Sequence, residues 1–310
     1  MSKLPNSLKA LINAPKARPN TVPAPPNIRS VYQKIQQTAQ SNNVSQPSWL
    51  ALSVSTTLSA SYIPKRGEDM SSRKILISFQ TAATMTMNSP ESLAILFQLA
   101  TASQSTDEGV SVAELMREVG LKCISFNGIP RTINCLNVFK ASLPDSVAEK
   151  LSRSPARAPT PENIDEIAHR GRALWDSIYR PFESKLYSKL ADSHPDLPVH
   201  ILNSHYGALL SDPANRRTGA TAGRISTSIV AVACLRAQSG VGPQVTSHVF
   251  GLRKALEDGT WVGDAESEEG AKWLASDEGN TWILKSVDDI VESISEGTGS
   301  NFAPSRGSKL

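Results

Sequence analysis

Apolar residues recur at helical spacing along most of the chain after residue 30. Such stripes fall in residues 30–40, 89–100, 111–119, 131–138, 160–178, 225–237, 243–256 and 286–294. Apolar positions three and four residues apart share one face of an α-helix, whereas a half-buried strand alternates every second residue. No run of strand length alternates in this way. The pattern therefore predicts an all-α protein.

Several predicted helices begin with residues that favour a helix start. Ser89 precedes Pro90, Ser111 and Glu114 have the spacing of a capping box, and Ser286 precedes two aspartates. The segments SVAELM from residue 111 and SVDDIV from residue 286 also resemble each other. Either the chain holds two degenerate copies of one helical unit, or these are unrelated capped helices with a common pattern.

Composition along the chain predicts its organisation. We expect a basic Pro-rich arm at 1–29, a first helical repeat at 30–150, a linker at 151–162, a second repeat at 163–296 and a flexible tail at 297–310. Within the first repeat, residues 54–80 duplicate the apolar Ser/Thr-rich character of their neighbours. Ser53 would join naturally to Thr81, so we predict an insertion outside the core. It is either a genuine surface loop or a gene-model insertion.

The composition excludes several classes of partner. The chain has 310 residues, 39% hydrophobic and 20% charged, which is enough for a sizeable core. No apolar run approaches the ~18 residues that span a bilayer, so we expect no membrane partner. The net charge of +3 shows no basic stripe, so we expect no nucleic-acid partner. Three cysteines without a CxxC pair predict buried free thiols, and no motif predicts a metal or cofactor.

The two ends of the sequence suggest different destinations. The last three residues, Ser308, Lys309 and Leu310, match the peroxisomal import signal and follow a polar, Gly/Ser-rich tail. They predict a peroxisomal protein with the import receptor as a partner. Residues 1–67 hold eight Lys or Arg and no acid, so a mitochondrial transit peptide is the alternative.

Two segments resemble a known family. One contains Glu118 and, ten residues later, the break Gly128-Ile129-Pro130; the other is an apolar helix at 228–237 followed by Gln244 and His248. In this order they resemble carboxymuconolactone decarboxylases and the related AhpD-like proteins, over residues 85–140 and 200–294. The resemblance implies an AhpD-like helical bundle built from two degenerate repeats. The family commonly forms oligomers, so a homo-oligomer is implied as well.

The resemblance also identifies candidate site residues. One branch of the family moves protons on a lactone acid, and the AhpD branch reduces peroxide through a CxxCxxxH thiol site. Here Val241 and Gln244 occupy the two cysteine positions, which disfavours peroxidase chemistry, and Leu96 replaces the histidine of the first repeat. His248 is therefore the candidate general acid or base. Gln244 one turn earlier could orient it or bind a substrate carboxylate, and His205 near a predicted helix start is a further candidate. The alternatives are a structural histidine for His248, a helix-capping role for Gln244 and a loop position without a function for His205.

The sequence leaves the function open between three alternatives. The first is an enzyme of carboxymuconolactone-decarboxylase type, a lyase acting on a small carboxylated or lactone substrate. The second is a non-catalytic helical scaffold that has the same fold. The third, an AhpD-like peroxidase, is disfavoured because the CxxC pair is absent.

Overall fold

The computed structural model describes residues 4–18, 20–42, 44, 70–102, 104–213, 221–262 and 268–298. Within these ranges the chain forms helices and no β-strand, which confirms the all-α prediction. The elements are α1 (Asn6–Ile12), η1 (Pro15–Ala17), α2 (Ile28–Ser41), α4 (Met70–Thr86), α5 (Pro90–Thr101), α6 (Thr106–Lys122), α7 (Ile124–Asn127), α8 (Ile129–Ser142), α9 (Asp145–Ala148), α10 (Ile164–Tyr179), α11 (Glu183–Ser193), α12 (Asp196–His200), η2 (Ile201–Leu210), α13 (Gly223–Gln238), α14 (Gly242–Glu257), α15 (Glu268–Ala275) and α16 (Asp277–Ser295).

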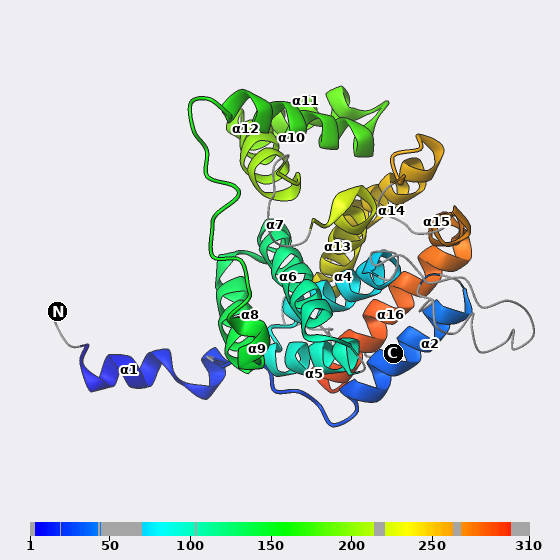
Figure 1. Cartoon of the computed structure of the whole chain (residues 1–310). Coiled ribbons are helices and arrows are strands. Elements are labelled where there is room, and N and C mark those ends of the chain that lie inside the picture. The colour runs from blue at the N-terminus through cyan, green and yellow to red at the C-terminus, as the bar shows by residue number, and fades with distance from the viewer. Residues whose placement is uncertain are drawn as a thin grey trace, which may run out of the picture.

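A central bundle forms around α4 and α13, which pack against each other inside a ring of other helices (Figure 1). Both helices are apolar or small-sided on nearly every face, and a helix of that kind is stable only when it is buried. Ala82, Ala83 and Ala233 are fully buried and let the two backbones approach closely. The core of this bundle extends from Ile28 to Ile294. The two predicted repeats therefore contribute side chains to one shared core.

The prediction that residues 54–80 lie outside the core is wrong for residues 74–80. These residues belong to α4, and Ile75, Ile77 and Phe79 are at most 3% exposed. Phe79 packs edge-on against Trp282 of α16, with ring centroids 5.3 Å apart. The apolar Ser/Thr-rich pattern that suggested an insertion is the pattern of a buried helix. Residues 54–69 lie outside the described residues.

A second layer packs against the bundle and is formed by α10, α11, α12 and η2, at the top of Figure 1. Its small core contains Trp175, Ile178, Tyr206 and Leu210. Gly171 of α10 lies against the backbone of Gly207 in η2, where a Cβ atom at residue 171 would be 2.6 Å from the Gly207 Cα. We call α10 and η2 together the upper layer, because this contact makes them one packed unit. In η2 the helix has π geometry, which is rare and often found at functional sites.

Several helix boundaries differ from their prediction. The helix predicted from Ser111 begins at Thr106, because Ser105 and Glu108 form the capping box. The last helix begins at Asp277 with Ser276 as its N-cap, and Ser286 is buried in its middle. The two similar segments therefore lie inside helices and not at helix starts. For the first of these helices, sequence spacing alone could not separate the alternatives, since Ser-x-x-Glu occurs both at Ser105 and at Ser111.

The structure confirms the predicted break in the helix at Gly128-Ile129-Pro130. Gly128 separates α7 from α8 with a φ of 78°, a left-handed conformation that glycine adopts without strain. Pro130 occupies the first turn of α8, where its missing N–H removes no helical hydrogen bond. The break turns the chain sharply between two helices that border the sites described next.

Candidate functional site

His248 lies on the inner face of α14 and is 5% exposed. Its Nε2 is 3.4 Å from the hydroxyl of Tyr179, at the end of α10, and that hydroxyl is 2.9 Å from the hydroxyl of Tyr206 in η2. Phe126 packs edge-on against the imidazole, with ring centroids 6.1 Å apart. We call His248, Tyr179, Tyr206 and Trp175 the imidazole cluster. It joins the bundle to the upper layer.

Burial controls the protonation of this cluster. Desolvation, and then the positive charge of Arg224, lower the pKa of His248 to about 4. Burial raises the pKa of Tyr179 and raises that of Tyr206 well above its usual range. At neutral pH the imidazole is therefore uncharged and both phenols keep their protons. His248, Tyr179 and Tyr206 thus form a neutral hydrogen-bonded chain inside the protein.

Two buried nitrogen atoms of the cluster have no protein partner in the described part of the chain. They are Nδ1 of His248 and Nε1 of Trp175. Buried polar atoms are nearly always hydrogen-bonded, to protein or to ordered water, and an unpaired one carries a free-energy cost of about 1–3 kcal/mol. An atom of a bound ligand or of water would satisfy either nitrogen.

The other two candidate residues lie apart from His248. Gln244 is exposed on the first turn of α14, where its backbone N–H donates to the carbonyl of Val241 at 3.1 Å. His205 is half-buried in the middle of η2; its Nδ1 lies 3.1 Å from the Ser125 hydroxyl and its ring contacts His200. Burial and then His200 lower the pKa of His205. The prediction that His205 lies at a helix start is wrong.

Sequence reasoning missed the tyrosines that contact His248. Tyr179 follows the apolar stripe of α10 that includes Trp175 and Ile178, so its position on a buried face was available from the spacing. Its pairing with Tyr206 and His248 joins residues separated by 27 and 69 positions. No local pattern contains that information.

A second polar group, which the sequence also did not indicate, lies below the upper layer. The fully buried Lys122, at the end of α6, pairs with Asp212 at 3.0 Å and donates to Thr227 and to the Leu210 carbonyl. Beside it, Arg157 of the predicted linker forms a bidentate ion pair with Glu118. Its Nη2 lies 2.5 Å from Oε1 and its Nη1 lies 3.1 Å from Oε2. We call Lys122, Asp212, Glu118 and Arg157 the ionic network. The linker is therefore anchored to α6 rather than free.

The charges in the ionic network stabilise one another. Burial alone would raise the pKa of Asp212, but the charge of Lys122 and the N–H of Gly223 lower it below its usual value. Asp212 is thus ionised at neutral pH. Burial lowers the pKa of Lys122, and the charges of Asp212 and Glu118 oppose this shift. A cavity of about 270 Å³ lies beside Glu118 and Arg157. The Arg157 guanidinium donates to Glu118 and to the Ser211 carbonyl, while its buried Nε has no partner among the described residues.

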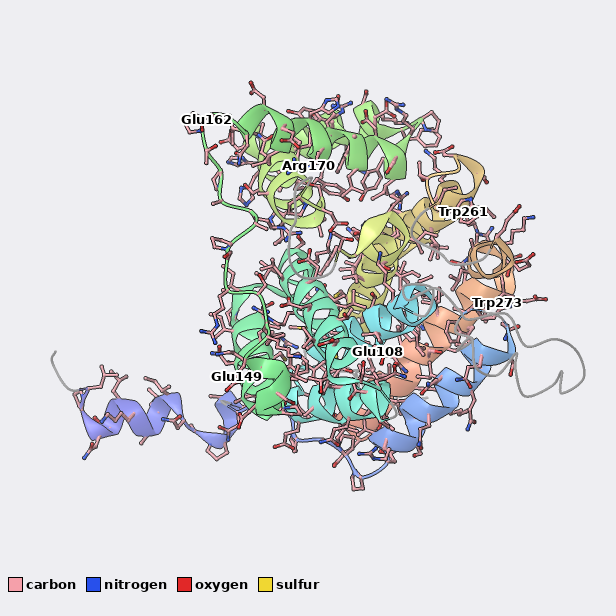
Figure 2. All side chains as sticks on the ribbon, viewed as in Figure 1. Glu108, Glu149, Glu162, Arg170, Trp261 and Trp273 are labelled. Carbon is pink, nitrogen blue, oxygen red and sulfur yellow. The ribbon has the colours of Figure 1, made fainter. Side chains whose placement is uncertain are left out.

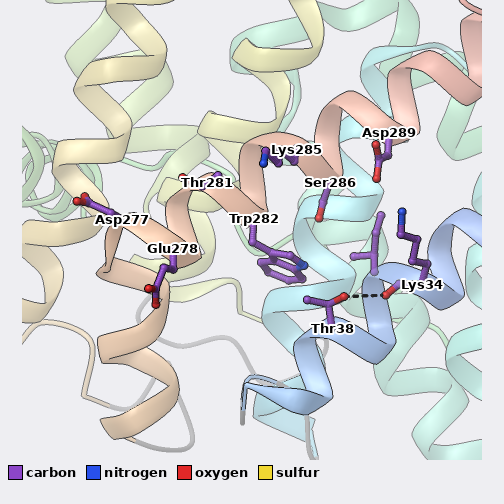
Figure 3. A pocket seen from close by; sticks show the side chains of 10 residues that line it. Lys34, Thr38, Asp277, Glu278, Thr281, Trp282, Lys285, Ser286 and Asp289 are labelled. Carbon is purple, nitrogen blue, oxygen red and sulfur yellow. Dashed lines mark hydrogen bonds between the residues drawn. The ribbon is translucent and has the colours of Figure 1, made fainter.

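Another hollow of about 490 Å³ lies between α2 and α16 (Figure 3). Trp282 lines it together with the charged residues Lys34, Lys285 and Asp289. These charges are of both signs and do not converge on one point. No group of three or more potential metal-ligating side chains occurs among the described residues.

All three cysteines are free and buried, as predicted. The Sγ atoms of Cys123 and Cys234 lie 3.5 Å apart, and burial raises the pKa of Cys123 well above its usual value and that of Cys135 to about 12. The reactive thiolate form is therefore suppressed. The pair lies in the bundle and not beside His248.

Comparison with known proteins shows a similarity over about half of the chain. The chain is 30% identical over 178 residues to Peroxisomal protein 2 of Saccharomyces cerevisiae, an alignment that covers 51% of this chain and 58% of the relative. The chain thus spans little more than half of that protein's length. No protein-family model matches the sequence, and no solved structure matches it. Along the described residues, no helix is both long and apolar enough to span a membrane.

Proposed function

We propose that this chain is a peroxisomal helical protein that performs acid–base chemistry on a small carboxylated or lactone metabolite at His248. The observation that carries the proposal is the buried, uncharged imidazole whose Nδ1 has no protein partner while Nε2 faces Tyr179. A neutral imidazole with one open nitrogen can accept a proton from a bound molecule. The resemblance to carboxymuconolactone decarboxylases supports the same substrate class.

The neighbouring tyrosines determine which nitrogen reacts. When Nε2 carries the proton it donates to the Tyr179 hydroxyl, which in turn donates to Tyr206, and Nδ1 is left as the acceptor. An imidazole with a pKa of about 4 is a weak base. A carboxylate bound beside it would raise that pKa, because a nearby negative charge favours the imidazolium. A charged substrate would therefore activate its own base.

A thermal-shift screen with small carboxylates and lactones, followed by turnover assays on the compounds that bind, tests the proposal. We expect His248→Gln to lower turnover by about 10²- to 10⁴-fold. Tyr179→Phe should lower it less, since the imidazole remains. His169→Gln, on the exposed face of α10, is the matched control and should retain full activity. A bound compound turned over equally by His248→Gln would overturn the proposal.

A non-catalytic helical scaffold is the second candidate. The burial of His248 and the exposure of Gln244 favour it, because the two side chains do not converge on a common ligand. In that case no compound should bind, and His248→Gln should reduce the free energy of unfolding by about 1–3 kcal/mol through loss of the Tyr179 contact. Urea unfolding of the two proteins measures this.

The relative's name and the last three residues of the sequence support the peroxisomal part of the proposal. A fluorescent protein fused before residue 1 should reach peroxisomes, and removal of Ser308, Lys309 and Leu310 should disperse it. Peroxisomal fluorescence that survives the deletion would contradict this targeting route. Mitochondrial fluorescence from a fusion at the other end, with the N-terminal arm intact, would favour the alternative destination.

A further inference from the structure

Helix α1 buries none of its residues against the rest of the described chain. Leu4, Leu8, Leu11 and Ile12 are 51%, 41%, 63% and 52% exposed. The helix projects away from the bundle in Figure 1, and Figure 2 shows its side chains surrounded by open space. Three large apolar side chains on this helix, and Leu4 just before it, are exposed and touch no core, so packing within the chain does not explain them.

These apolar residues share one face. At 3.6 residues per turn, residues 8, 11 and 12 of α1 fall within an arc of about 100°, the width of the apolar stripe of a surface helix. Asn6, Ser7 and Lys9 lie outside this arc. The helix is therefore amphipathic, with an apolar face that its own chain leaves uncovered.

The charge of the surrounding arm indicates what covers that face. Residues 1–29 contain five Lys or Arg and no acid. The net charge of the whole chain is +3, so residues 30–310 carry a net charge of −2. The positive charge of the arm is thus a local property and not part of a generally basic surface. Basic residues next to an apolar helical face match an anionic bilayer, whose headgroups attract Lys and Arg while the acyl boundary takes Leu and Ile.

We propose that α1 is an interfacial anchor that binds the surface of an anionic lipid membrane. It lies in the plane of the membrane and does not cross it, which agrees with the lack of a spanning helix in the described residues. The expectation of no membrane partner considered only spanning segments. A protein partner would need a groove shaped for Leu8, Leu11 and Ile12, whereas a bilayer does not. The anchor is independent of the chemistry proposed at His248.

Flotation of the purified full-length protein with vesicles tests this proposal. We expect it to float with phosphatidylcholine vesicles that contain phosphatidylserine, and to float less as salt is raised. The double variant Leu8→Glu with Leu11→Glu should lose at least about tenfold in vesicle binding, because two apolar side chains that enter the membrane surface are replaced by charged ones. Leu197→Glu, which alters an exposed leucine of α12, is the matched control and should bind normally.

The double variant should change membrane binding without changing the fold. Because α1 buries nothing in the bundle, the far-ultraviolet circular dichroism and the midpoint of unfolding of the double variant should match those of the wild type. Wild-type protein that fails to float, or a double variant that floats normally, would overturn the proposal. So would a double variant that changes the molar mass measured by light scattering without changing flotation, since α1 would then contact a second copy.

Discussion

The central bundle and the upper layer are stabilised by different kinds of contact. In the bundle, α4 and α13 are surrounded by apolar side chains from helices that are far apart in the sequence. The upper layer has a small core around four buried residues, and its helices meet the bundle largely through α14. Apolar burial contributes most of the folding free energy, so the bundle should dominate the stability of the protein.

Polar side chains gather at the boundary where these two regions meet, which we call the junction. The contacts are His248 with Tyr179, Arg224 with Ser177, His205 with Ser125, and Lys122 with the Leu210 carbonyl. Polar contacts add little net stability, but each fixes a distance and an orientation. The comparison teaches that the bundle supplies stability while the junction supplies the geometry of the candidate site.

The largest expected effect is in the bundle. Phe79→Ala should reduce the free energy of unfolding by about 3–5 kcal/mol, because it leaves a cavity against Trp282. Urea unfolding followed by circular dichroism measures the loss. Phe182→Ala, at a position that is 66% exposed, is the matched control and should change it by at most about 0.5 kcal/mol. A loss at Phe79 no larger than in the control would restore the prediction that this segment lies outside the core.

The pH dependence of stability tests the junction. The pKa of His248 is about 4 in the folded protein and about 6.5 when unfolded, so between these values the unfolded state binds the extra proton. The uncharged, buried His248 therefore contributes to the free energy of unfolding in full above pH 6.5, and this contribution is lost as the pH falls to about 4. Wild-type protein should lose about 3 kcal/mol more over this window than His248→Gln. Urea unfolding between pH 7 and pH 4 compares them; parallel curves would show that the imidazole is not desolvated.

A smaller effect is expected within the upper layer. Gly171→Ala should cost about 1–3 kcal/mol, because its Cβ would lie 2.6 Å from the backbone of Gly207. Gly242→Ala is the matched control, since no atom lies within 4 Å of a Cβ there. Thermal unfolding followed by circular dichroism compares the two. If Gly171→Ala is as stable as the control, α10 and η2 do not pack as closely as the structure shows.

The smallest effect is expected at the hydroxyl pair. Tyr206→Phe should reduce the free energy of unfolding by about 1 kcal/mol, the usual net contribution of one hydrogen bond. Tyr187→Phe, at a half-buried position of α11, is the matched control. The measurement is urea unfolding at neutral pH. A loss as large as that of Phe79→Ala would mean that the junction, and not the bundle, dominates stability.

The amino-acid sequence by itself determined the helical class, because the period of apolar residues is a local property of the chain. It placed α10, α13 and α14 within a few residues of their observed bounds, and it located the break at Gly128 and Pro130. It also identified His248 as a histidine on an apolar face. It failed at residues 74–80, where the composition of a loop rich in Ser and Thr and that of a buried helix are alike.

Only the tertiary structure decided which side chains meet. Tyr179 and Tyr206 reach His248 from two other helices, Arg157 crosses from the linker to Glu118, and Gln244, which shares a helix with His248, points to solvent. Burial, and with it the low pKa of His248, depends on helices that are distant in the sequence. Helical periodicity specifies which face of a helix is apolar, but the neighbour that covers this face is determined by packing of the whole chain.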